Sequence, residues 1–285
     1  MILIRIITLA LVCTHIMASA NQIDFMVLNM QGKKETEKRW KPLAQYLQQE
    51  LSQEVRLLTT PNTGFLRRSS DKEILLTNPV SAVIIEDTGE FEIIATLNHI
   101  KQGSTFAGVI IVHKNSSIKN LQDLAGKKVG VVNLKFAAGG FLFQANELVE
   151  AGVDPNKDFK RFIEMSNQTA IVKRVMQNQL DAGFIRTGML ESLSEEIDVS
   201  QLRIINRKED GLIYPRSTAI YPHWGLLVRK NMPEYFKQTL LNSLLKITAD
   251  SEISTTVKMK GFVPAKDYAS IKSIMKKLDV YQFKN

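Results

Sequence analysis

An arginine that follows an apolar run is the residue in this sequence best suited to hold an anion. Residues 182–185 read as a buried strand, and Arg186 and Thr187 follow at the head of a predicted helix. In α/β proteins, ligands bind at the carboxyl ends of strands. The planar guanidinium of Arg186 can hold two oxygens of a carboxylate, phosphate or sulfur oxyanion, and the Thr187 hydroxyl can orient them. A structural ion pair is the alternative for Arg186.

A second anion-binding candidate is the turn Lys135-Phe136-Ala137-Ala138-Gly139-Gly140, which connects a predicted strand at 129–132 to a predicted helix. Backbone N–H groups at a helix start point toward a ligand, the helix dipole favours negative charge, and Gly139 permits close approach. Lys135 would add a positive charge. Every strand-to-helix turn has such N–H groups, so an ordinary structural turn is the alternative.

Polar side chains at two further element ends are candidates for orienting a ligand. Asn78 follows a predicted strand in Thr77-Asn78-Pro79, and Ser166 and Asn167 precede a predicted helix. Asn-Pro is also a common turn, and serine and asparagine are common helix caps. Each of these side chains therefore has a purely structural interpretation as well.

The sequence gives little support for catalysis or for a metal site. It has no Gly-x-Ser-x-Gly motif and no evident Ser/His/Asp set. His99, His113 and His223 are isolated from one another and lack metal-ligand spacing, which predicts ordinary surface or hydrogen-bonded histidines. Trp40 and Trp224 are predicted in the core rather than as ligand platforms. We expect no catalytic residue, no cofactor and no metal.

The composition is that of a globular protein large enough for two lobes. The chain has 285 residues, 44% of them hydrophobic, and 37 Lys+Arg against 29 Asp+Glu. This excludes a collagen-like, disordered or multi-span membrane protein. The basic residues are scattered among acidic ones without a recognition motif, so nucleic acid is not an expected partner. The positive balance favours an anionic ligand.

The N-terminus reads as a secretory signal. Arg5 precedes an apolar run that is too short for a permanent membrane helix, and the run closes with Ala18-Ser19-Ala20. We expect cleavage after Ala20, which makes residues 1–20 a signal peptide and places the mature chain in the periplasm. A lipoprotein interpretation would use Cys13, but the preceding Val12 is bulky. Cleavage removes this cysteine, the single one in the sequence, in keeping with an oxidising compartment.

From residue 23 onward, short β-rich runs alternate with amphipathic stretches, which predicts an α/β protein with largely parallel strands. Strands are predicted at 23–28, 55–58, 74–77, 91–97, 108–112, 129–132, 159–165, 182–185, 203–205 and 224–228. Helices are predicted at 40–51, 120–124, 140–151, 169–177, 187–193, 235–245 and 268–278. Pro42 is tolerable only if the regular helix begins near it.

Several motifs occur in a telling order. They are Leu28-Asn29 with Trp40-Lys41-Pro42-Leu43, Leu121-x-Asp123-Leu124-x-Gly126-Lys127-Lys128-Val129, Glu150-Ala151-Gly152-Val153-Asp154-Pro155-x-Lys157-Asp158-Phe159 and Leu180-Asp181-Ala182-Gly183. In this order the chain resembles periplasmic substrate-binding proteins of the phosphate/phosphonate type. Three further motifs resemble the branch that serves as sensor input domains of histidine kinases: Thr77-Asn78-Pro79, Arg186-Thr187-Gly188-x-Leu190-Glu191 and Ser217-Thr218-x-x-Tyr221-Pro222-x-Trp224.

The resemblance implies a two-lobe α/β periplasmic binding protein fold of type 2, with strand crossovers near 106–112 and 218–227. One lobe would comprise residues 21–107 plus 220–285, and the other residues 108–219. The implied function is capture of a small anionic ligand by hinge closure, with no reaction catalysed. The expected partner of this monomer is an ABC permease or, alternatively, a membrane sensor kinase. An exported hydrolase or transferase using the same cleft is the remote alternative.

The resemblance also indicates where the ligand would differ. Family phosphonate binders hold the anion with hydroxyl groups of a turn that corresponds to residues 135–140. Here Lys135-Phe136-Ala137-Ala138 lacks those hydroxyls. A larger or differently shaped oxyanion, or a small organic acid, is therefore expected, with Arg186 and Lys135 countering its charge.

Overall fold

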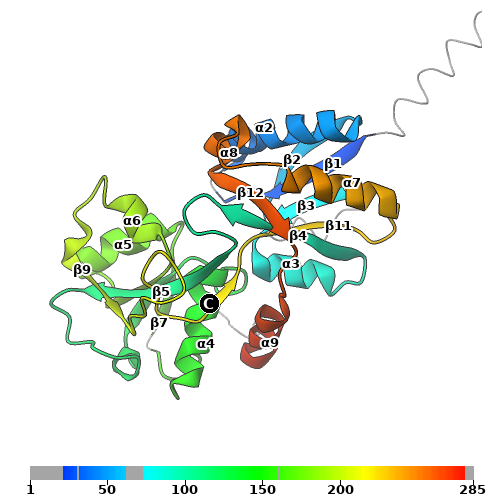
Figure 1. The fold of residues 1–285 in the computed structure, drawn as a ribbon. Helices are drawn as coiled ribbons and strands as arrows, with labels where there is room; N and C mark the ends of the chain where they lie inside the picture. The colour runs from blue at the N-terminus through cyan, green and yellow to red at the C-terminus, as the bar shows by residue number, and fades with distance from the viewer. Residues whose placement is uncertain (1–21, 31, 62–72, 160, 280–285) are drawn as a thin grey trace, which may run out of the picture.

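The computed structural model describes residues 22–30, 32–61, 73–159 and 161–279, whose strands form two six-stranded sheets (Figure 1). The first sheet has the spatial order β12 (Met259–Pro264), β4 (Phe91–His99), β11 (Gly225–Arg229), β3 (Glu73–Thr77), β1 (Ile23–Leu28) and β2 (Val55–Thr60). The second has the order β10 (Ile220–Pro222), β5 (Thr105–His113), β8 (Ala182–Arg186), β6 (Lys128–Val131) and β7 (Arg161–Glu164), and β9 (Leu202–Ile205) also pairs with β5.

The first sheet is covered on both faces, which explains why its inner strand β1 is apolar at every position except Asp24. All six residues of β1 are buried. One face carries α2 (Lys33–Leu51), α7 (Glu234–Leu245) and α8 (Glu252–Val257), and the other carries α3 (Pro79–Glu86). We call this sheet with these helices the first lobe.

The second sheet is built in the same way around β5. One face packs against the π-helical turn η4 (Ala138–Leu142) and α4 (Phe143–Glu150), which continues directly from it. The other face packs against α5 (Gln168–Met176) and α6 (Met189–Leu193). We call this sheet with α4, α5 and α6 the second lobe. Two short 3₁₀ turns, η3 (Gln122–Leu124) and η5 (Val199–Gln201), lie in its connections.

The C-terminal helix α9 (Ala269–Leu278) contacts both lobes (Figure 1). It packs against α3 of the first lobe and α4 of the second. Its buried residues Ile271, Ile274 and Leu278 belong to the same apolar cluster as the core of the second lobe.

The chain passes between the sheets twice. The first passage, residues 100–104, joins β4 to β5, and the second, His223 and Trp224, joins β10 to β11. The passages lie side by side, because His223 N–H donates to the Ser104 carbonyl at 2.9 Å. The second lies inside its predicted range. The prediction for the first, 106–112, is wrong because those residues belong to β5 itself.

Two further predictions need correction. The strands are mixed rather than largely parallel: β1 and β6 have parallel neighbours, but β4, β5, β10, β11 and β12 pair antiparallel. The crossing strands return through the sheets in the opposite direction, which the local pattern does not encode. Helix α2 begins at Lys33, well before Pro42, because burial of Trp40, Leu43 and Leu47 on the sheet stabilises it through the proline.

The proposed signal peptide, residues 1–20, lies outside the described residues. No helix in the described ranges is both long enough and apolar enough to cross a bilayer.

Candidate ligand-binding site

A cavity of about 110 Å³ lies where the two passages meet, and residues of both lobes line it. Its walls are formed by Arg39, Trp40, Leu97, His99, Phe106, Arg186, His223 and Trp224. Larger hollows exist, such as one of about 480 Å³ between α2 and β2, but that one draws on the first lobe alone. The interlobe cavity is the candidate site because its lining combines both lobes with unneutralised positive charge.

Arg186 occupies the last position of β8, at the end of the strand that faces the cavity. Its Nη1 donates to the Thr187 carbonyl at 2.9 Å, and its backbone N–H donates to Gln168 Oε1 at 3.1 Å. Burial lowers the pKa of the guanidinium, and Glu191 opposes that shift. An arginine nevertheless stays charged at neutral pH. Arg186 therefore presents a fixed, half-buried positive charge to the cavity.

Arg39 brings a second positive charge from the first lobe. Its Nε and Nη2 donate to the Val257 carbonyl at 3.0 and 2.6 Å, which caps an end of α8 that a helix leaves unsatisfied. Its guanidinium lies 5.3 Å from the centre of the Trp40 ring. Burial and the charge of Arg186 both lower its pKa. Across the described ranges, neither arginine forms an ion pair with a carboxylate.

Aromatic rings make up most of the remaining wall. Trp40 and Trp224 stack with ring centres 6.4 Å apart, and His99 and His223 stack at 5.6 Å. Phe106 lies 5.0 Å from the His223 ring. The cavity is therefore cationic at its two arginines and aromatic elsewhere.

Both cavity histidines are neutral at physiological pH. Burial, followed by the charges of Arg186 and Arg39, lowers the pKa of His99 to about 4. Burial, followed by His99 and the same arginines, holds the pKa of His223 well below its usual range. His99 Nδ1 accepts from Lys101 N–H at 3.3 Å, and His223 Nδ1 accepts from Trp224 N–H at 2.9 Å. Nε2 therefore carries the proton on each ring and can donate to an anion.

The structure places the predicted turn at residues 135–140 beside the cavity rather than in its wall. A Cβ at Gly139 would lie 2.8 Å from the Phe106 ring and 3.1 Å from Arg186 Cβ, so glycine lets η4 pack against both residues. Lys135 is exposed. Asn133 Oδ1 already accepts the N–H groups of Lys135 and Phe136, at 2.9 and 2.8 Å.

The Ala137 N–H donates to the Asn133 carbonyl at 3.4 Å. The backbone N–H groups of residues 135–137 thus have acceptors within the chain. An anion-binding role for Lys135, Phe136, Ala137 and Gly139 stays a prediction.

The remaining predicted polar residues make structural hydrogen bonds. Asn78 caps α3 by accepting from Val80 and Ser81 N–H at 3.0 and 3.1 Å. Exposed Asn167 caps α5, accepting from Ala170 N–H at 2.9 Å, and Ser166 beside it is exposed.

Buried Thr187 accepts from Ala107 N–H at 3.2 Å and donates to Gln102 Oε1 at 2.9 Å, which ties β8 to β5 and to the first passage. Of the predicted site residues, Arg186 is the one that lines the cavity. Ligand contacts by Asn78, Ser166, Asn167 and Thr187 stay predictions.

Sequence reasoning missed Arg39 and assigned the histidines and tryptophans to other roles. The expectation that His99 and His223 are isolated from each other is wrong, since the adjacent passages bring them into a stack. The core prediction for the tryptophans holds in part. Trp40 belongs to a buried apolar cluster and Trp224 packs against that cluster, but both residues also line the cavity. For His223 and Trp224 the sequence did offer a signal, because both residues fall in the predicted crossover at 218–227, where the lobes meet. Among the described residues, no cluster of metal-ligating side chains occurs.

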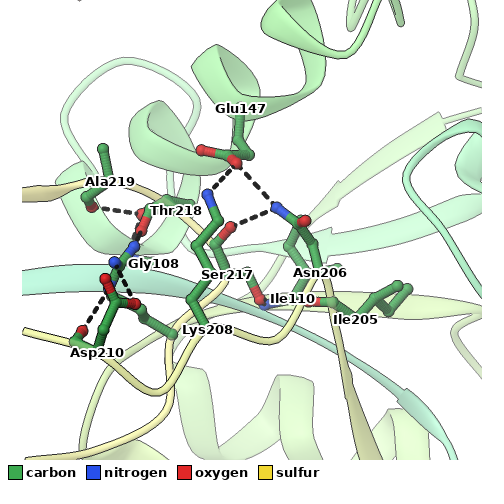
Figure 2. A network of polar contacts seen from close by, with 11 residues as sticks. Gly108, Ile110, Glu147, Ile205, Asn206, Lys208, Asp210, Ser217, Thr218 and Ala219 are labelled. Carbon is green, nitrogen blue, oxygen red and sulfur yellow. Dashed lines mark hydrogen bonds and ion pairs between the residues drawn. The ribbon is translucent and has the colours of Figure 1, made fainter. Parts of the chain in front are cut away.

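A polar network in the second lobe holds the segment that leads into β10 and the second passage (Figure 2). Between β9 and β10 the edge of β5 is completed by side chains: Ile110 N–H donates to Ser217 Oγ at 2.8 Å, and Gly108 N–H donates to Thr218 Oγ1 at 2.9 Å. Asn206 Nδ2 donates to Glu147 Oε1 at 2.8 Å and to the Ser217 carbonyl at 2.7 Å.

Lys208 pairs with the same Glu147 carboxylate, at 2.5 Å, so this network joins α4 to the loop between β9 and β10 (Figure 2). The loop is thereby anchored directly before β10 and the second passage. The serine and threonine of the Ser217-Thr218 motif thus have a structural role that places His223 and Trp224.

Comparisons with known proteins agree with this architecture. Residues 25–269 match the model of a family described as "ABC transporter, phosphonate, periplasmic substrate-binding protein". The chain is 25% identical over 214 residues to the tetrathionate sensor histidine kinase of Salmonella typhimurium, a match that covers 70% of this chain and 35% of that protein. It is 21% identical over 261 residues to the phosphonates-binding periplasmic protein of Escherichia coli, covering 88% of this chain and 73% of that one.

A Prochlorococcus marinus protein solved in complex with methylphosphonate superposes with a TM-score of 0.71 at 19% identity, over 91% of this chain and 99% of that one. At this identity the likeness concerns the fold. The expected two-lobe periplasmic binding protein fold with two interlobe crossovers is confirmed. The chain spans about a third of the length of the sensor kinase, as the coverage of 35% indicates.

Proposed function

The chain belongs to the family of periplasmic substrate-binding proteins of phosphonate-type ABC transporters, and we propose that it captures a small oxyanion in the cavity between its lobes. The observation that carries this proposal is the pair of guanidinium groups in one cavity wall without a carboxylate partner among the described residues. A buried charge is costly unless it is paired. An anionic ligand would supply the missing partner for Arg39 and Arg186.

The ligand class follows from the donors that line the cavity. The remaining N–H groups of two arginines and two imidazole Nε2–H groups suit the oxygens of phosphonates and of sulfur oxyanions. The names of the relatives include both classes, phosphonates for the E. coli protein and tetrathionate for the Salmonella kinase. We propose an oxyanion from these two classes, with Arg39 and Arg186 countering charge.

Binding would favour closure of the lobes because the cavity takes one arginine from each of them. Arg39 belongs to α2 of the first lobe, and Arg186 to β8 of the second. A ligand that contacts both arginines stabilises the closed form more than the open form and shifts the equilibrium toward it. Residues 21–107 with 220–285, and residues 108–219, are the proposed moving units. No bond is made or broken.

The proposed partner of this monomer is the permease of an ABC importer, which would receive the closed form. A membrane sensor kinase is the second candidate, favoured by the match of 214 residues to the Salmonella sensor. Permease genes beside the gene for this chain would support import, whereas a kinase and response regulator would support sensing. Residues 1–20 are the proposed signal peptide that directs the chain to the periplasm.

A thermal-shift screen of residues 21–285 tests the proposed function. The panel contains phosphate, methylphosphonate, sulfate, thiosulfate, tetrathionate and small carboxylates, with neutral and cationic solutes as controls. Free ligand at about 100 times its Kd should add about 2.7 kcal/mol to stability and raise Tm. A folded chain whose Tm no oxyanion raises would contradict the proposal.

The matched variants are Arg186→Ala in the cavity and Arg174→Ala on the exposed surface of α5. We expect Arg186→Ala to weaken the affinity for the oxyanion found in the screen by at least tenfold, since it removes one of the two cavity charges. Arg174→Ala should leave affinity unchanged. Equal affinities of the two variants, measured by calorimetric titration, would remove Arg186 from the site.

A further inference from the structure

We infer that Gln102, in the first passage between the lobes, is a positioning residue for Arg186, because it holds the peptide unit whose carbonyl fixes the direction of the guanidinium. This inference rests on the proposed function, since it takes Arg186 as the anion-binding residue of the second lobe. It goes further by giving a role in recognition to a residue outside the cavity wall.

Arg186 takes its direction from the carbonyl of the next residue. Its Nη1 donates to the Thr187 carbonyl at 2.9 Å. The direction of that carbonyl is set by the peptide unit between Thr187 and Gly188. Rotation of this peptide unit would therefore turn the anchor away from the guanidinium.

Gln102 contacts both residues of this peptide unit. Its Oε1 accepts from Thr187 Oγ1 at 2.9 Å, and its Nε2 lies 2.6 Å from the position that a Cβ at residue 188 would occupy. Gly188 has a φ of +74°, in the left-handed region that favours glycine. Its missing side chain leaves the space that the Gln102 amide fills, so the amide packs directly against the unit that carries the anchor.

The hydrogen bond to Gln102 also satisfies a buried hydroxyl. Thr187 is buried, and its Oγ1 already accepts from Ala107 N–H at 3.2 Å. Its proton needs an acceptor, which Gln102 Oε1 supplies. A buried donor without an acceptor is costly, so loss of the Gln102 amide favours a different arrangement of Thr187 and of its carbonyl.

Gln102 is itself fixed by the turn of the first passage. His99 and Gly103 exchange backbone hydrogen bonds at 2.8 and 2.9 Å, and Gln102 N–H donates to His99 Nδ1 at 3.4 Å. The Gln102 side chain is buried. Because His99 lines the cavity, one closed turn carries both a residue of the cavity wall and the residue that supports Arg186.

The first test needs no ligand. NMR of the guanidinium N–H groups in the mature chain shows whether rotation of the Arg186 side-chain head is restricted, and its signals are assigned by their absence in Arg186→Ala. We expect restricted rotation in the wild-type chain and averaged signals in Gln102→Met, which keeps the length of the side chain but removes the amide. Averaged signals in the wild type, or restricted signals in Gln102→Met, would overturn the inference.

Two further variants accompany this measurement. Gln238→Met, at an exposed position of α7, is the matched control and should give the wild-type signals. Thr187→Val removes the same hydrogen bond from the other side and should give averaged signals like those of Gln102→Met. It replaces Gln102→Met if circular dichroism shows that the latter does not fold.

The second test asks whether Gln102 acts on recognition through Arg186. Calorimetric titration uses whichever of methylphosphonate, sulfate and thiosulfate binds the wild-type chain most tightly. We expect Gln102→Met to weaken its affinity about fivefold in the wild-type background and less than about twofold in the Arg186→Ala background, because residues that act as a unit are not additive. Equal losses in the two backgrounds, or a lowered Tm with unchanged affinity, would show that Gln102 has a structural role alone.

The two tests separate failure of this inference from failure of the proposed function. If no oxyanion binds the wild-type chain, the proposed function is contradicted, but the guanidinium signals still show whether Gln102 positions Arg186. If an oxyanion binds and Gln102→Met leaves both its affinity and those signals unchanged, the proposed function stands and the role of Gln102 is overturned.

Discussion

In the proposed site, Arg39 and Arg186 select the ligand because they are charged and anchored, and neither pairs with a carboxylate among the described residues. Each guanidinium donates a hydrogen bond to a backbone carbonyl, and this bond fixes the direction of the side chain in the absence of a ligand. Preorganised donors lose little conformational freedom on binding. In the proposed site, both guanidinium groups are therefore in place, one on each lobe, before a ligand binds.

The stacked histidines predict a pH dependence of stability. His99 and His223 have pKa values below the unfolded value of 6.5, so the unfolded chain takes up protons at a higher pH than the folded chain. This contribution is constant above pH 6.5, and stability falls as the pH drops from 6.5 toward about 4. Urea denaturation of the ligand-free chain across this range measures the slope.

The controls separate the cavity histidines from other titrating groups. His99→Gln and His223→Gln should each flatten the slope, whereas His113→Gln, away from the cavity, should leave it unchanged. Equal slopes for all three variants would contradict the account of the stacked pair. An anion bound beside the rings should reduce the slope, because negative charge favours protonated imidazole.

For individual residues, the sequence predicted that Arg186 faces a ligand cavity, but it did not predict the same for Arg39. Arg186 was recognisable because it directly follows a buried strand, where α/β folds place ligands. Arg39 lies inside an amphipathic helix, and its position in the cavity depends on the α8 carbonyl that holds it, 218 residues further along the chain. Such distant partners leave no local pattern.

Among the elements, the two passages position most of the cavity wall. His99 ends β4, Phe106 lies at the start of β5, and His223 and Trp224 form the second passage. Apolar runs and turns predicted the strands themselves. Whether two strands pair parallel or antiparallel was not predictable, because it depends on the direction in which the chain enters each sheet after crossing from the other.

Tyr268 connects the C-terminal segment to the second passage, and we expect its hydroxyl group to contribute to the free energy of unfolding. Its hydroxyl donates to the His223 carbonyl at 2.8 Å and accepts from Thr96 Oγ1 at 3.1 Å. Tyr268→Phe leaves the His223 carbonyl without this buried donor, which should cost about 1 to 2 kcal/mol of unfolding free energy. Chemical denaturation at neutral pH measures it.

Tyr235→Phe, at an exposed position, is the matched control and should be neutral. We also expect Tyr268→Phe to weaken oxyanion affinity, since the second passage loses an anchor beside the cavity. A Tyr268→Phe variant as stable as the Tyr235→Phe control would show that this link contributes nothing.

Across the whole molecule, α9 joins the two lobes on one side while the cavity lies between them. Lys272 of α9 pairs with Asp87, directly after α3, and Lys277 pairs with Glu150 at the end of α4. The apolar face of α9 packs into a cluster that contains residues of both lobes. Helix α9 therefore contacts both lobes on the side away from its exposed face, and it is a common neighbour of the two proposed moving units.

The most direct test uses the tryptophans. The sequence contains two, Trp40 and Trp224, and both line the cavity. Titrating the mature chain with the oxyanion found by thermal shift should produce a saturable change in tryptophan emission, with the same Kd as calorimetry. Arg186→Ala should shift that titration at least tenfold toward higher concentration. An oxyanion that raises Tm and saturates by calorimetry, yet leaves the emission of both tryptophans unchanged, would show that it binds elsewhere and would contradict the interlobe site.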